Sequence, residues 1–128
     1  MRLLLDTCTF LWVTRGDAQL SADAAALFRD PANEVFLSAV SAWEIAVKHQ
    51  LGKLPLPDAP TFYVPRERQR HGIEALPLDE ADTLMLERLP AVHADPFDRL
   101  LVCQAIQRGL TLLTPDPQIH RYPVAVRW

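Results

Sequence analysis

Short apolar segments alternate with helix-length amphipathic segments along the whole chain, and this alternation constrains the fold more than any other feature. Such a pattern is typical of an α/β domain in which helices connect the strands of a largely parallel sheet. We expect strands at residues 3–5, 34–37, 73–76, 111–113 and 124–126. With 128 residues, the chain fits one domain, spanning 1–128, that can bury its own core.

The helices that the pattern predicts between these strands begin at side chains that suit an N-cap. We expect caps at Thr7 or Asp6, and at Ser21, Ser41 and Asp95, because short polar side chains accept hydrogen bonds from the free N–H groups of a first turn. The expected helices cover residues 7–12, 21–31, 41–51, 61–71, 79–89 and 95–108. The three prolines between residues 55 and 60 predict a rigid connector within the domain and not a domain boundary.

Composition excludes several classes of protein. The longest apolar runs contain only a few residues, so we expect no membrane span, no signal peptide and a cytoplasmic location. Cys8 and Cys103 match no metal-finger spacing and suit a reducing compartment better than a disulfide scaffold. The net charge is −3, with two lysines and eleven arginines. This balance neither favours nor excludes an RNA substrate, because arginine suits contact with phosphate and acids can cluster around bound cations.

Three acidic residues occupy positions where an α/β sheet places its chemistry. Asp6 comes directly after the first strand, Asp116 follows the fourth, and Asp98 lies in the first turn of the helix that leads into the fourth. Because ligands bind at the carboxyl edge of such sheets, these three can converge. Glu44 and Asp98 also share helical stripes with apolar residues, where an unpaired carboxylate is costly. A divalent cation would neutralise the group, which suits metal-assisted phosphodiester hydrolysis.

Each of these acids also has a purely structural explanation. Ser41 and Glu44 have the spacing of a capping box, in which Glu44 would bond the N–H of the cap residue. Asp95 and Asp98 have the same form at the start of the strongest helix, and Asp116 between two prolines suits a turn. Periodicity alone leaves the catalytic and the structural interpretations open. The joint placement of the acidic residues favours the catalytic interpretation.

Four stretches of the chain resemble those of PIN domains, specifically the VapC-type toxins of bacterial toxin–antitoxin pairs. They are residues 3–7, 38–45, 93–101 and 113–117, which read LLLDT, SAVSAWEI, HADPFDRLL and LTPDP. Together, in this order, they cover nearly the whole chain. The resemblance implies a three-layer α/β/α sandwich around a central parallel sheet of about five strands.

By this resemblance, the activity is that of an endoribonuclease toxin that uses Mg²⁺ or Mn²⁺ and leaves a 5′-phosphate. The resemblance assigns four residues both as metal ligands and as catalytic groups: Asp6, Glu44, Asp98 and Asp116. Supporting roles fall to the hydroxyls of Thr7 and Thr114, to Asp95 as a helix cap, and to Arg99 in contact with a carboxylate or phosphate. The implied partners are an RNA substrate, a cognate antitoxin and a second copy of the chain.

The chain departs from the family pattern at Cys8 and Pro115, where relatives often carry a polar and a basic residue. We interpret Cys8 as a small buried filler beside the site. Elsewhere, Arg66, Arg68 and Arg70 are candidates for contact with an RNA backbone, although a solvated helix face is the commoner explanation for such a run.

Other α/β proteins that gather acids around Mg²⁺ fit the chain less well. A receiver domain needs a lysine near its last strands, whereas no lysine follows Lys53. A dehalogenase-type phosphatase needs a second aspartate two residues after Asp6, where Cys8 stands. A P-loop NTPase is excluded because no glycine-rich stretch precedes a Lys-Ser or Lys-Thr pair. The remaining alternative is a catalytically weak or inactive PIN-like module that binds RNA or protein.

Overall fold

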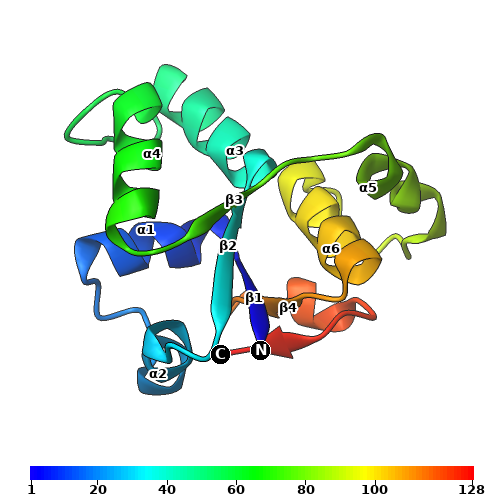
Figure 1. Ribbon diagram of the computed structural model, residues 1–128. Helices are drawn as coiled ribbons and strands as arrows, with labels where there is room; N and C mark the ends of the chain where they lie inside the picture. The colour runs from blue at the N-terminus through cyan, green and yellow to red at the C-terminus, as the bar shows by residue number, and fades with distance from the viewer.

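Five parallel strands form one sheet at the centre of the computed structural model, which describes residues 1–128 (Figure 1). Their order is β3-β2-β1-β4-β5, and every neighbouring pair is parallel. The strands are β1 (Arg2–Leu5), β2 (Glu34–Ser38), β3 (Glu74–Leu76), β4 (Thr111–Leu113) and β5 (Val126–Arg127). Helices cover both faces, so the predicted three-layer α/β/α architecture is confirmed.

The connections between the strands contain six α-helices and two 3₁₀ helices. They are α1 (Thr7–Arg15), α2 (Ala22–Arg29), α3 (Ala39–Gln50), α4 (Pro60–Arg70), α5 (Glu80–Leu84), η1 (Met85–Arg88), α6 (Pro96–Arg108) and η2 (Ile119–Arg121). In Figure 1, α1, α2 and α4 lie on one side of the sheet, and α5 and α6 lie on the other. None of these helices has both the length and the apolar character that crossing a membrane requires.

The three leucines of the first strand are fully buried because this strand lies in the middle of the sheet, between β2 and β4. Leu3, Leu4 and Leu5 have no exposed area. Since successive side chains of a strand point to opposite faces, Leu3 and Leu5 join the core cluster that includes residues of α1 and α4. Leu4 joins the second cluster, which α6 dominates. The sheet therefore carries two core layers, and β1 contributes to both.

Two helix starts bear on the acidic residues. Of the two expected candidates, Asp6 and not Thr7 caps α1, where its side chain accepts a hydrogen bond from the Thr7 N–H at 2.8 Å. Ser38 caps α3 by accepting from the Val40 N–H at 3.0 Å, so this helix begins before the predicted cap at Ser41. Ser41 is thus inside the helix, and the explanation of Glu44 as half of a capping box is wrong.

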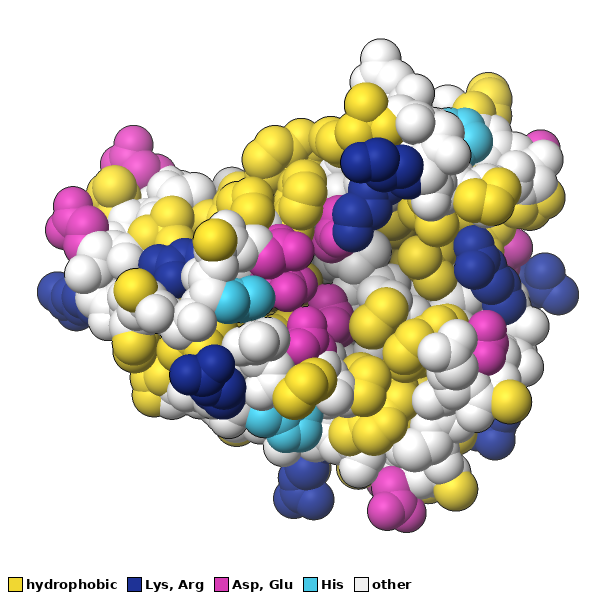
Figure 2. All heavy atoms as spheres, turned by 180° about the vertical axis from the view of Figure 1, so that it is seen from behind, with side chains coloured by type: hydrophobic (Ala, Val, Ile, Leu, Met, Phe, Trp, Pro, Cys, Tyr) yellow, Lys and Arg dark blue, Asp and Glu magenta, His cyan; other side chains and the backbone are white.

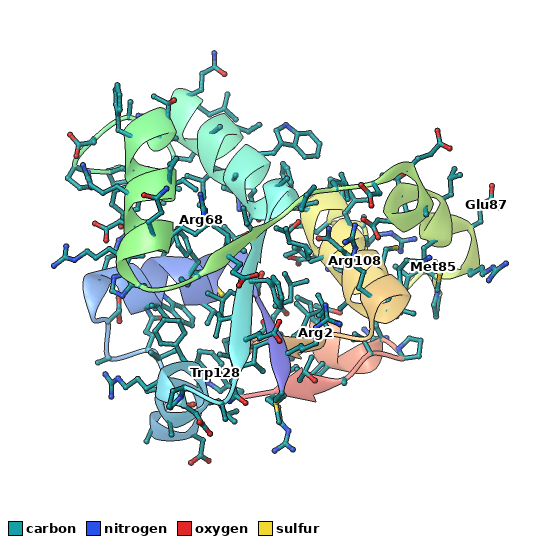
Figure 3. All side chains as sticks on the ribbon, viewed as in Figure 1. Arg2, Arg68, Met85, Glu87, Arg108 and Trp128 are labelled. Carbon is teal, nitrogen blue, oxygen red and sulfur yellow. The ribbon has the colours of Figure 1, made fainter.

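The predicted helix over residues 79–89 is divided into α5 and the 3₁₀ helix η1. Its last residue, Leu89, precedes Pro90 and is extended, because a proline disfavours helical backbone in the residue before it. Arg108 of α6 donates to the Asp82 carboxylate and holds α5 against α6 (Figure 3). The fifth strand lies at Val126–Arg127, slightly later than expected, and η2 was not predicted.

Candidate metal centre

Three aspartate carboxylates from distant parts of the chain meet at the carboxyl edge of the sheet. One oxygen each from Asp6, Asp98 and Asp116 lies within 4.8 Å of the others. Asp6 directly follows β1, Asp116 lies in the loop after β4, and Asp98 is in the first turn of α6. Their convergence follows from the topology, because neighbouring parallel strands end at the same edge and Leu5 is paired with Leu113.

The Asp6 carboxylate is held by hydrogen bonds to both of its oxygens. Its Oδ1 accepts from the Thr7 N–H at 2.8 Å, and its Oδ2 accepts from the Thr114 hydroxyl at 2.7 Å. The same hydroxyl accepts from the Asp116 N–H at 3.1 Å, so Thr114 connects two members of the group. Only 5% of Asp6 is exposed, and this burial raises the pKa of its carboxyl against the opposing effect of the hydrogen bonds.

Asp98 is crowded by negative charge. Burial raises the pKa of its carboxyl to about 7, and the charges of Asp6, Asp95 and Asp116 act in the same direction. The hydrogen bond between His93 Nε2 and Asp98 Oδ2, 3.1 Å long, opposes this shift. Carboxylates at this separation repel one another unless they share a cation. The donor set therefore fits a hard divalent cation with oxygen ligands.

A cavity of about 400 Å³ opens beside the three aspartates. Figure 2 shows acidic side chains gathered in a hollow near the centre of this face, with lysine or arginine side chains beside them. The residues that line the cavity are Asp6, Thr7, Cys8, Leu11, Glu44, Lys48, Lys53, Leu54, Asp95, Asp98 and Asp116. All four predicted ligands are among them, and so are both lysines of the chain.

Comparison with known proteins connects this fold and site to a family. A family model described as the PIN domain matches residues 3–125. The chain belongs to the PIN domain family. This PIN domain is 45% identical over 111 residues to Ribonuclease VapC16 of Mycobacterium tuberculosis, in an alignment that covers 84% of this chain and 74% of that protein.

Solved structures share the fold of this PIN domain over nearly its whole length. The structure of VapBC2 from Rickettsia felis, bound to a DNA fragment from its promoter, matches this chain with a TM-score of 0.73. The two sequences are 16% identical, and the match covers 99% of this chain and 98% of that chain. DNA-bound VapBC from Salmonella typhimurium matches with a TM-score of 0.72 and 16% identity over 99% and 97% of the two chains. At this identity the likeness concerns the fold, and it confirms the predicted PIN-like sandwich.

Glu44 of this PIN domain lies in the wall of the cavity and outside the group of three aspartates. Its Oε1 accepts from the Thr7 hydroxyl at 2.7 Å, and its Oε2 forms an ion pair with Lys48. The Thr7 and Ser41 hydroxyls lie 2.9 Å apart and complete this small network. Partial burial alone would lower the pKa of Lys48, but the hydrogen bond to Glu44 and its charge raise it. Both oxygens of the predicted fourth ligand are therefore already engaged.

Of the four predicted supporting residues, Thr7 and Thr114 bond the carboxylates of Glu44 and Asp6 as described above. The other two are Asp95 and Arg99. Asp95 caps α6 as expected, because its side chain accepts from two N–H groups of the first turn at 2.9 and 3.1 Å. Arg99 makes no contact with a carboxylate. Its Nη1 donates instead to the backbone carbonyls of His93 at 3.1 Å and Pro90 at 3.3 Å. Arg99 thus fixes the segment before α6, so the expected contact with a carboxylate is wrong, whereas the alternative contact with a phosphate stays a prediction.

The three arginines of α4 do not line the cavity. Arg66 is paired with Asp58 at 2.7 Å. Arg68 donates to the carbonyl of Ile73 at 3.3 Å, beside β3 (Figure 3), and Arg70 is largely exposed. The structure does not bring these predicted RNA contacts to the three aspartates.

Sequence reasoning missed three residues that the structure brings to the site. Lys48 and Lys53 line the cavity, and the signal that could have found them is that the only two lysines follow Glu44 closely. His93 contacts Asp98 from the segment that leads into α6. It lies within the HADPFDRLL stretch, but the spacing does not show that its ring faces the carboxylate.

Cys8 also lines the cavity, and it is partly exposed and not a buried filler as expected. Its Sγ lies 3.5 Å from Asp6 Oδ2. Burial and the negative charge of Asp6 raise the pKa of the Cys8 thiol to about 12, so it is protonated at neutral pH.

Proposed function

We propose that this chain is a metal-dependent endoribonuclease that acts as the toxin of a toxin–antitoxin pair. The observation that carries the proposal is the convergence of Asp6, Asp98 and Asp116 within 4.8 Å beside a cavity that is open to a substrate. Family membership supports it, and so does the relative in Mycobacterium tuberculosis that is named a ribonuclease. We also propose that the protein acts in the cytoplasm, where it would meet its RNA substrates.

The proposed cofactor is Mg²⁺ or Mn²⁺, because the converging donors are all carboxylate oxygens, which these hard cations prefer. Asp6, Asp98 and Asp116 would hold the ion, whose charge would relieve the repulsion that contributes to the raised pKa of Asp98. A divalent cation bound there supplies activation of a water molecule and polarisation of the scissile phosphate.

The side chains around the aspartates supply positioning. Thr114 fixes Asp6, and Thr7 holds Glu44, which we retain as a proposed outer member of the site at the cavity wall. Lys48 and Lys53 bring positive charge to a cavity whose other charged residues are all carboxylates. We propose that these two lysines bind the phosphates that flank the scissile bond, since phosphate contacts supply most of the affinity for a nucleic acid backbone.

The proposed partners are a cognate antitoxin and a second copy of the chain. Three of the solved structures with this fold are named as VapBC assemblies, two of them bound to DNA, which supports an antitoxin partner. We also propose that residues 1–128 act as one domain, because both core clusters are built on the same sheet.

Incubation of the purified protein with tRNA and mRNA, with and without Mg²⁺ or Mn²⁺, tests this function. We expect cleavage that requires the ion, stops when EDTA is added, and falls roughly 100-fold or more in Asp98→Asn, which removes a ligand. Glu87→Gln is the matched control, because Glu87 is an exposed carboxylate at the periphery of the molecule (Figure 3).

Two results would contradict the proposal. Undiminished cleavage by Asp98→Asn would show that the site is elsewhere. Binding of RNA without cleavage, at every concentration of either ion, would favour the inactive PIN-like binding module.

A further inference from the structure

His93 lies between a member of the aspartate group and a buried tyrosine. Its Nε2 is 3.1 Å from Asp98 Oδ2, and its Nδ1 is 2.7 Å from the Tyr122 hydroxyl. Only 16% of the His93 side chain and 14% of the Asp98 side chain are exposed. Tyr122 is 4% exposed, and the two rings are tilted with their centroids 5.4 Å apart. The imidazole is thus held on both sides and shielded from most solvent.

The contacts of Tyr122 determine which ring nitrogen carries the proton. The Tyr122 oxygen faces two N–H donors, the His93 backbone N–H at 3.3 Å and Arg99 Nη1 at 3.4 Å. Its own hydrogen has two possible acceptors, His93 Nδ1 at 2.7 Å and the His93 carbonyl at 3.4 Å. The carbonyl already accepts from Arg99 at 3.1 Å, so the much shorter contact assigns the hydroxyl hydrogen to Nδ1. In a neutral imidazole the proton then lies on Nε2, and this N–H donates to Asp98.

Arg99 fixes the backbone of His93. Its Nη1 donates to the His93 carbonyl at 3.1 Å and to the Pro90 carbonyl at 3.3 Å. The segment between η1 and α6 is consequently tied down at two points, and the orientation of the His93 backbone is set before its ring meets Asp98.

We propose that His93 is a positioning residue for the metal centre. Its Nε2–H holds the Asp98 carboxylate in the orientation that converges with Asp6 and Asp116, while Tyr122 selects the required tautomer. This inference rests on the proposed function, because it assigns His93 to the site that would bind the divalent cation. Hydrogen bonds to ligating groups are known to orient them, and their loss typically lowers metal affinity or activity by about 10- to 100-fold.

Binding of Mn²⁺ to the purified protein, measured by electron paramagnetic resonance, tests the proposal without RNA. His93→Leu removes the donor at similar size, and we expect Mn²⁺ affinity to fall about 10- to 100-fold. His93→Gln retains an N–H near the position of Nε2, and it should recover a large part of that loss. A role that is only structural predicts no such recovery.

Nitrogen-15 NMR of the His93 ring tests the tautomer in mildly alkaline buffer, where an ordinary imidazole is neutral. We expect a protonated Nε2 and an unprotonated Nδ1 in the wild-type protein, and a mixture of tautomers in Tyr122→Phe. Tyr63→Phe is the matched control, because it removes a buried hydroxyl that does not line the cavity. This hydroxyl bonds the Thr14 hydroxyl at 2.7 Å.

The outcomes separate this inference from the proposed function. If Asp98→Asn loses Mn²⁺ binding but His93→Leu binds as tightly as the wild type, the positioning role is refuted and the metal site stands. If the wild type binds no Mn²⁺, or if Asp98→Asn binds it unchanged, the proposed function fails first. A ring protonated on Nδ1 in the wild type would also overturn the assignment.

Discussion

Replacement of Asp98 with asparagine should stabilise the metal-free protein although it removes a proposed ligand. In the folded protein the Asp98 carboxyl has a pKa of about 7, whereas its ordinary value is 3.8. Between these values the folded state binds more protons than the unfolded state, so the free energy of unfolding falls as the pH rises. Asparagine carries no charge, and its side-chain oxygen can still accept from His93. Asp98→Asn therefore removes the loss of stability that ionisation of Asp98 causes, and it keeps the hydrogen bond with His93.

The size of the gain follows from the pKa difference. About three pKa units, at about 1.4 kcal/mol each, set a ceiling of about 4 kcal/mol above about pH 7. A Coulomb estimate is similar, because two unit charges 4.8 Å apart repel by about 3.5 kcal/mol at an effective dielectric constant of about 20. Small movements of the side chains reduce both values. We expect a gain of about 1–3 kcal/mol, or roughly 4–12 °C in melting temperature.

Thermal unfolding followed by circular dichroism in EDTA provides the measurement. Asp98→Asn should melt above the wild type at about pH 8, and the difference should vanish at about pH 2.5, below the ordinary pKa of 3.8, where Asp98 is protonated in both states. Glu87→Gln should stay within about 0.5 kcal/mol of the wild type at both values. Saturating Mn²⁺ should reverse the order, because only the wild type gains the full binding energy. An equal gain at both pH values would refute the burial and repulsion of the ionised Asp98 carboxyl as the cause.

Three further predictions concern other parts of the cavity. Lys53→Gln should weaken binding of labelled RNA, measured by fluorescence anisotropy on the Asp98→Asn background, and should reduce the slope of log affinity against log salt by about 0.7. Asp95→Ala removes the cap of α6 and should cost about 1 kcal/mol in urea unfolding, whereas no change would mean that the cap contributes nothing. Cys8 should react with iodoacetamide far more slowly than free cysteine at neutral pH, and rapid labelling would contradict its raised pKa of about 12.

Much of the fold was predictable because strand burial and helix capping leave strong local signals. The continuous apolar run of Leu3, Leu4 and Leu5 reports a strand buried on both faces, and β1 occupies that position. The start of α3 was predicted wrongly, because Ser38 and Ser41 are both good caps in sequence. The choice between them depends on where β2 ends, which is a property of strand pairing and not of local preference.

The candidate site was partly predictable for a related reason. Strand order places Asp6 and Asp116 at one edge, and helix direction places Asp98 there, so backbone topology alone brings the three together. The positions of Glu44 and His93 depend on side-chain partners instead. Glu44 turns toward Thr7 and Lys48, and the orientation of the His93 ring depends on a tyrosine that follows it by 29 residues. Periodicity carries no information about such pairs.

The central place of β1 has a consequence for the synthesis of this protein. Asp6 leaves the ribosome well before its companion Asp116, which belongs to the loop after β4, the strand that completes the other flank of β1. A nascent chain that stops before β4 lacks both that neighbour and one acid of the group. If the group is the nuclease centre, a half-translated chain is harmless to the messenger and tRNAs that are producing it. The group would be complete only after Asp116 has left the ribosome and β4 has paired with β1, so the antitoxin would be needed from that point on.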